Sequence, residues 1–196
     1  MNIKGHVTIG TAAAFLVNPA LGIPLTITTV ISAAFGSVIP DLDHPKSKLN
    51  QKILPLKRNK AMKMFIYCLF GSLALYSSYA KFNSTLLNCI GIILIMIGIS
   101  HHRGFTHSGV GLLIFYITVQ LFTQKYGYKY EGMSFMIGYA SHLAGDFFTD
   151  QGIEILYPID DKNYKAPLRF TTGGDVETLL TASSVAFIGY RLINML

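Results

Sequence analysis

The stretch Met64–Ser100, MFIYCLFGSLALYSSYAKFNSTLLNCIGIILIMIGIS, decides the fold class because Lys81 is its only charged residue. A run of this length suffices for two membrane helices of roughly 20 residues each. Lys81 and Asn83 then fall in a tight turn between the two helices. The sequence therefore predicts a helical hairpin that crosses a lipid bilayer.

The composition of the whole chain agrees with a membrane protein. Charged residues make up 13% of the 196 residues and the mean hydropathy is +0.44, whereas a soluble domain contains about 25% charged residues. Cys68 and Cys89 lie within predicted spans and are interpreted as small buried hydrophobes. The chain has no Walker-type phosphate loop, Gly-x-Ser-x-Gly elbow, His-Glu-x-x-His helix or Cys-x-x-Cys pair, which argues against the common soluble enzyme classes.

The remaining apolar runs extend this pattern into an all-α fold. Pro19 and Pro24 divide the first apolar region into two helices, since proline does not continue a helix comfortably. The first helix is short, so it either crosses the membrane or dips into it. We expect a single domain over residues 1–196, an integral membrane bundle of about five to seven helices, near Gly5–Val17, Leu21–Ile39, Met62–Ala80, Thr85–Ser100, Gly109–Gln124, Gly132–Phe148 and Val176–Asn194.

Basic residues predict the orientation of these helices. The densest positive segment is Asp41–Lys63, which contains Lys46, Lys48, Lys52, Lys57, Arg58, Lys60 and Lys63. Positively charged loops stay in the cytoplasm. Threading the chain from this segment places all six histidines and nine of the ten acidic residues on the same side, with Glu131 as the exception. The sequence thus predicts that ionisable side chains converge at the cytoplasmic face.

One pair of candidate metal ligands lies near the inner end of the sixth predicted helix. His142 and Asp146 are four residues apart, so they occupy one helix face and could share a metal ion. The alternative is a buried histidine that is held by the carboxylate one turn away.

A second group follows Pro40 at the end of the second predicted helix. Asp41, Asp43 and His44 offer the oxygen and nitrogen donors that suit zinc, manganese or another divalent first-row ion. The alternative is a capping turn before the basic segment.

A third group, His101–Ser108, places three histidines beside an arginine. Gly104 permits a sharp bend that could direct His102, His107 and Arg103 into one pocket. The threonine and serine of this stretch are natural N-caps for the next helix. A guanidinium matches phosphate oxygens, so Arg103 is a candidate phosphate-binding residue; otherwise it is a membrane-surface anchor.

The first and last predicted helices supply three further candidates. His6, Asp175 and Glu177 could complete the site from these helices. Each also fits an ordinary terminal or capping residue.

These motifs together resemble the YdjM-like family of inner-membrane-associated proteins, described as LexA-binding metal-dependent hydrolases. The resemblance covers about Gly5 to Asp150, and His102–Ser108 is its most specific motif. The family is similar, more remotely, to zinc-dependent phospholipase C and to zinc-dependent single-strand nucleases, which are all-helical. The second His-x-x-x-Glu helix of those phospholipases has no counterpart in this chain. The resemblance implies as metal ligands His6, Asp41, His102 or His107, His142 and Asp146.

We therefore expect a multi-pass hydrolase of the inner (cytoplasmic) membrane whose active site faces the cytoplasm. One or two divalent ions, zinc first among them, would activate a water. Asp41 or Asp43 would serve as the base and Arg103 would hold a phosphate. The expected partners are membrane lipid and a lipid-phosphoester substrate, with no direct contact to nucleic acid. The alternatives are a metal-binding or transport protein without hydrolytic activity, and a noncatalytic scaffold whose basic segment recruits a soluble partner.

Overall fold

The computed structural model describes residues 1–43, 60–101 and 103–195, and over these ranges the fold is all-helical as predicted. The only β-type pairings in the described ranges are two isolated bridges, Thr149 with Phe170 and Ile153 with Tyr164. The α-helices are α1 (Ile3–Ala20), α2 (Ile27–Gly36), α4 (Lys60–Ser77), α5 (Thr85–Ile99), α6 (Gly109–Lys125), α7 (Glu131–Phe147) and α8 (Asp175–Ile193). Short turns complete the set: η1 (Ile39–Asp43), η2 (Ser78–Phe82) and η3 (Phe105–His107).

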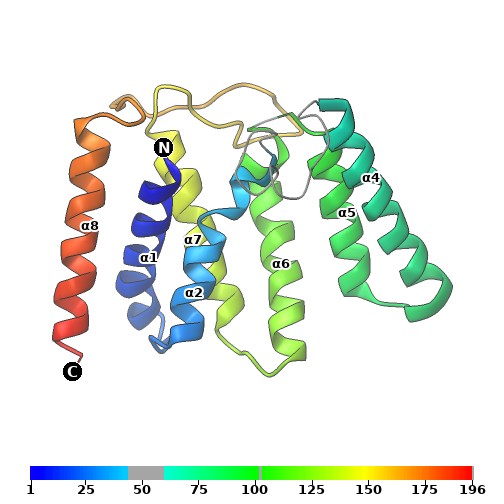
Figure 1. The fold of residues 1–196 in the computed structure, drawn as a ribbon, viewed down its shortest axis with the longest axis horizontal. Helices are drawn as coiled ribbons and strands as arrows, with labels where there is room; N and C mark the ends of the chain where they lie inside the picture. Colours follow the sequence, from blue (N-terminus) through cyan, green and yellow to red (C-terminus); the bar gives the residue numbers. More distant parts are fainter. Residues whose placement is uncertain (44–59, 102, 196) are drawn as a thin grey trace.

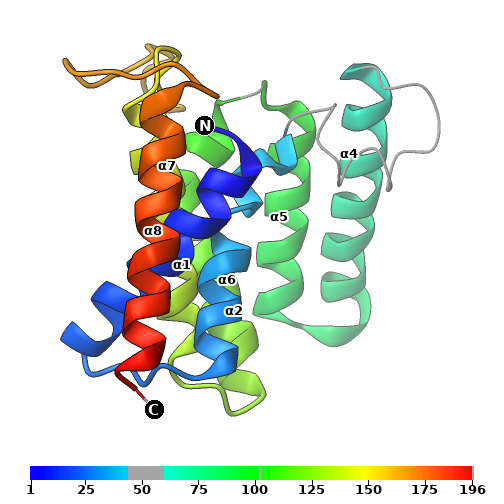
Figure 2. The ribbon, with the colours of Figure 1, turned by 60° about the vertical axis from the view of Figure 1, so that its left-hand side comes forward.

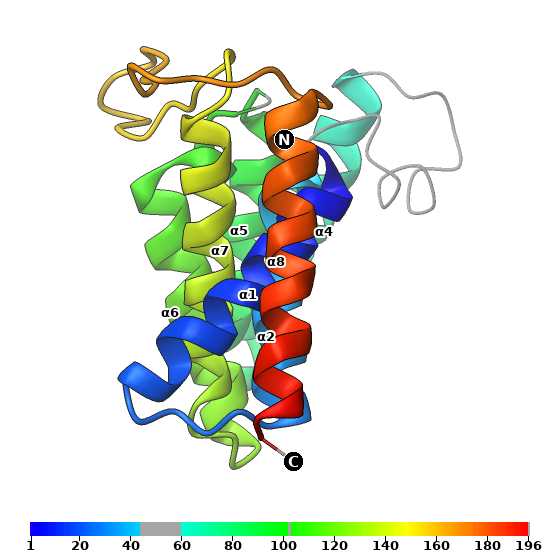
Figure 3. The ribbon, with the colours of Figure 1, turned by 90° about the vertical axis from the view of Figure 1, so that its left-hand side faces the viewer.

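The helices stand side by side, and α7 lies at the centre of the group (Figure 1). It contacts α1, α2 and α6, while α8 packs on α1 at one edge and α4 packs on α5 at the other. The α4–α5 pair stands beside the remaining helices in Figure 2, and α1 is inclined to α7 and α8 in Figure 3. One end of the bundle therefore gathers the N-terminus, η1, η3 and the long connection from α7 to α8 (Figure 1).

The first two helices differ from the predicted boundaries. Pro19 lies inside the last turn of α1, which runs on to Ala20 rather than ending at Val17; the proline removes only its own hydrogen bond to the preceding turn, and the helix ends one residue later. The next helix begins at Ile27 rather than Leu21, because Thr26 caps it just after Pro24. It ends at Gly36 and is followed by η1, so the predicted continuous helix to Ile39 was wrong.

Two glycines bring α2 against α7. A Cβ atom on Gly36 would lie 2.2 Å from the carbonyl oxygen of Phe135, and one on Gly138 would lie 1.9 Å from that of Ala33. Neither position has room for a side chain. The close approach places η1, which follows α2, beside the C-terminal half of α7.

The predicted hairpin is present as α4 and α5. The turn between them includes Asn83 in the left-handed conformation, with φ 40°. Gly71 and Gly91 let the helices approach, since a Cβ atom on Gly71 would lie 2.8 Å from the Gly91 carbonyl oxygen. Lys63, the last residue of the positive segment, is nevertheless buried, with 2% of its surface exposed, and its Nζ donates to the carbonyl oxygens of Asp43 and Ser100.

Two of the described helices are long and apolar enough to cross a membrane. They span Lys60–Phe82 and Asp175–Ile193, and only 22% and 6% of their most apolar windows are buried. A core helix of a soluble protein would have most of such a window buried. The apolar helices α2 and α5 are shorter. Two helices of the predicted membrane bundle of about five to seven are therefore supported as possible spans among the described residues.

Candidate metal centre

His107, His142 and Asp146 form a compact buried group at the end of the bundle that gathers η1 and η3. The Nε2 atoms of the two histidines are 3.2 Å apart. Oδ2 of Asp146 lies 3.5 Å from Nε2 of His107 and 3.8 Å from Nε2 of His142. Helix α7 supplies two of these side chains from successive turns, and η3 supplies the third. The predicted i, i+4 pair therefore does face the histidine of the His102–Ser108 motif.

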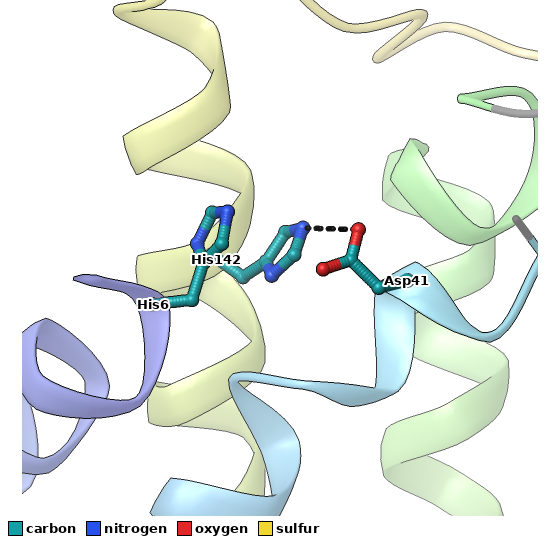
Figure 4. A group of neighbouring side chains, drawn as sticks. All are labelled: His6, Asp41 and His142. Carbon is teal, nitrogen blue, oxygen red and sulfur yellow. Dashed lines mark ion pairs between the residues drawn. The ribbon is translucent and has the colours of Figure 1, made fainter. Parts of the chain in front are cut away.

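A second group of potential ligands shares His142 with the first. It consists of His6 from α1, Asp41 from η1 and His142, with the donor atoms within 4.8 Å of one another. Oδ1 of Asp41 is 3.9 Å from Nε2 of His142, and the His6 ring stacks on the His142 ring with centroids 3.6 Å apart (Figure 4). Side chains from α1, η1, η3 and α7 thus meet at one point.

The protein fixes the orientation of the His142 ring. Its Nδ1 lies 2.8 Å from the carbonyl oxygen of Ser37. A carbonyl only accepts, so Nδ1 carries the proton and donates it. The lone pair of the neutral ring is then on Nε2, which faces Asp41, Asp146 and His107. Metal-binding histidines usually have their second nitrogen held in this way.

The His107 ring is held by a similar chain of contacts. The Thr106 hydroxyl donates to Oδ2 of Asp43 at 2.8 Å and lies 3.1 Å from Nδ1 of His107. Because the single hydroxyl proton is already donated to the carboxylate, Nδ1 of His107 donates to the Thr106 oxygen. Nε2 is again the nitrogen that faces the centre of the cluster.

His6 shows the opposite situation. Its ring is 1% exposed, and neither nitrogen makes a hydrogen bond within the described chain. Its Nε2 pairs with Oδ1 of Asp146 at 3.2 Å, whereas its Nδ1 has no polar partner in the described chain. Buried polar groups without a partner are rare and costly. The position therefore fits a ligand of an ion better than a structural histidine.

The charges around Asp146 are mostly positive or potentially positive. Its carboxylate lies between the three histidines, the amino group of Met1 and the Arg103 guanidinium, whose Nη2 is 3.3 Å away. Burial lowers the pKa of His107, but hydrogen bonds and charge from the Asp146 and Asp43 carboxylates outweigh it and raise this pKa to about 9. In the metal-free protein His107 is therefore the group that carries a proton into the cluster.

Asp43 and Arg103 lie next to the cluster rather than within it. Asp43 is fully buried and accepts from the backbone N–H of Arg103 at 2.9 Å as well as from Thr106. Arg103 has φ 72°, an uncommon conformation for a non-glycine residue. Its Nη1 donates to the Gly152 carbonyl oxygen. Asp43 thus fixes the turn that carries His107, and Arg103 ties that turn to Asp146 and to the α7–α8 connection.

The chain matches one protein family over almost its whole length. A family model described as "YdjM inner membrane protein" matches residues 1–195. The chain belongs to the YdjM inner membrane protein family. It is 28% identical over 151 residues to the uncharacterized protein YvsG of Bacillus subtilis (strain 168), covering 77% of this chain and 69% of the relative. No solved structure matches the chain.

In this YdjM family member the structure brings together most of the predicted ligands, namely His6, Asp41, His107, His142 and Asp146. Two predicted candidates, His44 and His102, lie outside the described residues. His101 is turned elsewhere, with Nε2 2.7 Å from Oε1 of Glu154. Among the candidates from the last helix, Asp175 is exposed. Glu177 is buried and accepts from the backbone N–H groups of Asn2 and Gly173, so it anchors the start of α1.

Three supporting residues were not recognised as such from the sequence. Ser108 does cap α6, as expected, by accepting from the Gly111 N–H. Thr106, expected in the same capping role, instead bridges Asp43 and His107. Tyr139 donates to the Thr106 carbonyl at 2.6 Å, and Ser37 holds His142 through its backbone. A backbone acceptor such as that of Ser37 and a single tyrosine such as Tyr139 leave no recognisable motif in the sequence. Only Thr106 could have been found, because it lies between Arg103 and His107 in the predicted motif.

The donor spacing fits a divalent ion. Metal–nitrogen distances near 2.0–2.1 Å place adjacent tetrahedral donors roughly 3.3–3.4 Å apart. The donor separations in the His107–His142–Asp146 group are 3.2, 3.5 and 3.8 Å. Imidazole and carboxylate donors suit zinc and other first-row divalent ions. The residues present could therefore hold such an ion with small adjustments.

Proposed function

We propose that this YdjM family member is a membrane-bound, metal-dependent hydrolase that acts on a phosphoester of a lipid at the cytoplasmic face. The observation that carries the proposal is the orientation of His107 and His142. Each ring has its Nδ1 engaged by the protein, so that both Nε2 atoms face Asp146. When His107 has lost its second proton, the lone pairs of both Nε2 atoms point at the space beside the Asp146 carboxylate, which favours a bound cation.

The ion would be held first by His107, His142 and Asp146, with His6 and Asp41 available for a second ion or for further coordination. A bound divalent ion supplies a Lewis acid that makes a water nucleophilic near neutral pH. The two groups share His142, so one or two ions are compatible with the donor set.

The surrounding residues have separate tasks in this proposal. Asp41 has a side chain that is 28% exposed and borders the cluster, so it can accept the proton of an attacking water. Asp43 is fully buried behind His107, which favours a positioning role over that of the base. Arg103, 13% exposed, has a guanidinium beside Asp146 where it can bind phosphate oxygens.

The lipid substrate and the cytoplasmic orientation are supported by the exterior and by the charges. Apolar side chains cover the exposed faces of α4 and α8, including Phe70, Leu73 and Leu179. The sequence between Asp43 and Lys60 connects two points at the site end of the bundle and carries Lys46, Lys48, Lys52, Lys57 and Arg58. Positive segments of this kind remain on the cytoplasmic side. A headgroup at that surface would reach the cluster while its chains stay in the bilayer.

The test is a hydrolysis assay on detergent-purified protein that is metal-free or loaded with zinc. The substrates are phospholipids, lysolipids and polyprenyl phosphates, and released headgroup or phosphate is measured. We expect zinc-dependent turnover that His142→Ala and Asp146→Ala remove and that His101→Ala retains, because His101 pairs with Glu154 outside the cluster. Zinc-loaded protein that is inert on all three substrate classes would contradict the hydrolase proposal.

A second candidate function is a metal-binding or transport protein without hydrolytic activity. One observation favours it: the side chains of His6, His107, His142 and Asp146 are at most 3% exposed. Closed sites hold structural ions, whereas catalytic sites keep an open position. Stoichiometric zinc without turnover on any substrate class would favour this alternative.

A further inference from the structure

An apolar pocket of about 470 Å³ lies beside the candidate metal centre, between α1, α7, α8 and the segment 168–170. Its volume is within the range of small-molecule binding sites. Apolar side chains dominate its wall, among them Ile9, Phe148, Val176 and Leu180. None of the predicted site residues lines this hydrophobic pocket.

The pocket borders the cluster, because Met1, whose amino group pairs with Asp146, also lines the pocket. Met1 and Gly145 line the pocket. A Cβ atom on Gly145 would lie 3.1 Å from Cε of Met1 and 3.6 Å from Cε1 of His6. A ligand in the pocket would therefore lie near the His6 side of the cluster.

One side of the pocket is formed by a candidate membrane helix. Val176, Leu180 and Ser184 of α8 line it at intervals of four residues, which places them on one helix face. Helix α8 is also the more exposed of the two helices long enough to span a bilayer, with 6% of its apolar window buried. A lipid chain could thus enter between α7 and α8 without passing through water.

The mouth of the pocket carries one positive charge. Arg169 lines the pocket at the loop end and makes no ion pair or hydrogen bond within the described chain. A second apolar pocket, of about 340 Å³, lies at the opposite end of the bundle and is lined by Phe15, Leu25 and Ile188 among others. In contrast to the first pocket, it has no charged residue in its wall. An apolar pocket with a guanidinium at its mouth is complementary to an acyl chain with a phosphate at its head.

We propose that this pocket binds an acyl chain of a membrane phospholipid, with Arg169 at the lipid phosphate. The proposal rests on the proposed function, because it identifies where the substrate of the same site is held. It makes the α7–α8 gap the lateral route from the bilayer to the pocket beside the cluster.

The experiment uses a phospholipid with a photoreactive acyl chain, cross-linked to the full-length protein in detergent micelles, and peptide mapping by mass spectrometry. We expect labelling at Ala144–Phe148 and Val176–Ser184. Unlabelled phospholipid should compete for this labelling, and diacylglycerol, which has the same chains without the phosphate, should compete less. Arg169→Gln should remove that difference, whereas Arg191→Gln, at the other end of α8, should preserve it.

Two filling variants test the pocket from opposite walls. Ala144→Trp on α7 and Ser184→Trp on α8 should each lower the labelling by about tenfold, since an indole would occupy the space. Val185→Trp is the matched control, because Val185 is the neighbour of Ser184 on the exposed face of α8 and is 57% exposed. It should leave labelling unchanged.

Bound metal, measured on the same samples, separates this proposal from the proposed function. Two outcomes, each with normal metal content, would overturn the pocket assignment alone. In the first, labelling is spread evenly over the exposed faces of α4 and α8. In the second, neither filling variant lowers the labelling. If the unmodified protein binds no metal, the proposed function is overturned, whatever the lipid labelling shows.

Discussion

The Nε2 atoms of His107 and His142 face each other at 3.2 Å, while the Nδ1 atom of each ring donates to the protein. Two neutral rings in this arrangement would direct their lone pairs at each other. A proton on one ring relieves the repulsion in the metal-free protein, and a metal ion relieves it when bound.

Zinc should stabilise the protein through this pair. A ligand at about 100 times its Kd stabilises the folded state by roughly 2.7 kcal/mol. Adding zinc to chelator-treated protein should therefore raise Tm in differential scanning calorimetry, and His142→Ala should abolish the shift. His101→Ala should keep it. Equal shifts in all three proteins would place the zinc elsewhere.

Metal binding should release a proton, and the affinity should fall as the pH falls. The pKa of His107 is raised from 6.5 to about 9 in the folded protein. In the metal-free protein this group contributes stability that is complete below pH 6.5 and is lost as the pH rises through about 9. The metal competes with the same proton, so its affinity should drop by about tenfold for each pH unit below 9.

Isothermal titration with zinc at pH 7, repeated in buffers of different ionisation enthalpy, measures this proton directly. We expect release of about one proton per bound ion. Binding with no proton release would show that His107 is not a ligand.

Thr106→Val should weaken both the fold and the metal site. The valine would remove the hydroxyl that bridges Asp43 and His107. Loss of a buried hydrogen-bond partner costs about 1–3 kcal/mol, and loss of a group that orients a metal ligand costs roughly 10–100-fold in metal affinity. Chemical unfolding and a zinc titration measure the two effects.

Thr118→Val is the matched control, since Thr118 is also buried but its hydroxyl bonds only the Ile114 carbonyl of its own helix. Its zinc affinity should match that of the unmodified protein. An equal loss of affinity in both variants would contradict the orienting role of Thr106.

Gly71→Ala should destabilise the α4–α5 hairpin. The new Cβ atom would lie 2.7 Å from Cγ1 of Ile95 and 2.8 Å from the Gly91 carbonyl oxygen. Overpacking of this kind costs about 1–3 kcal/mol. Gly189→Ala on α8 meets nothing within 4 Å and should instead be neutral or stabilising. The Tm of Gly71→Ala should fall while that of Gly189→Ala stays unchanged or rises, and a fall of Tm in both alike would contradict the close packing.

The sequence predicted the helices well wherever local signals and packing agreed. The predicted Thr85–Ser100 and Gly109–Gln124 each differ by one residue from α5 and α6, because Ser84 and Ser108 cap them. The region around α2 was harder to predict, since its apolar residues continue past Gly36 into η1. Nothing in the local sequence shows that the chain turns there, because the turn depends on packing against α7.

The candidate site was predictable in its ligands and not in its supports. Lysine and arginine positions alone placed His6, His107, His142 and Asp146 on one side, and the structure brings them into contact. The stacking of His6 on His142 and the bond from His142 to the Ser37 carbonyl depend on how α1 and α2 lie against α7. Such contacts are tertiary and leave no pattern in the chain.

The central claim is that His107, His142 and Asp146 hold a divalent ion, and elemental analysis of detergent-purified protein tests it most directly. The unmodified protein and His101→Ala should retain one or two zinc or other divalent first-row ions per chain, and His142→Ala should retain markedly fewer. An absence of bound metal after incubation with zinc, or the same metal content in all three proteins, would contradict the claim.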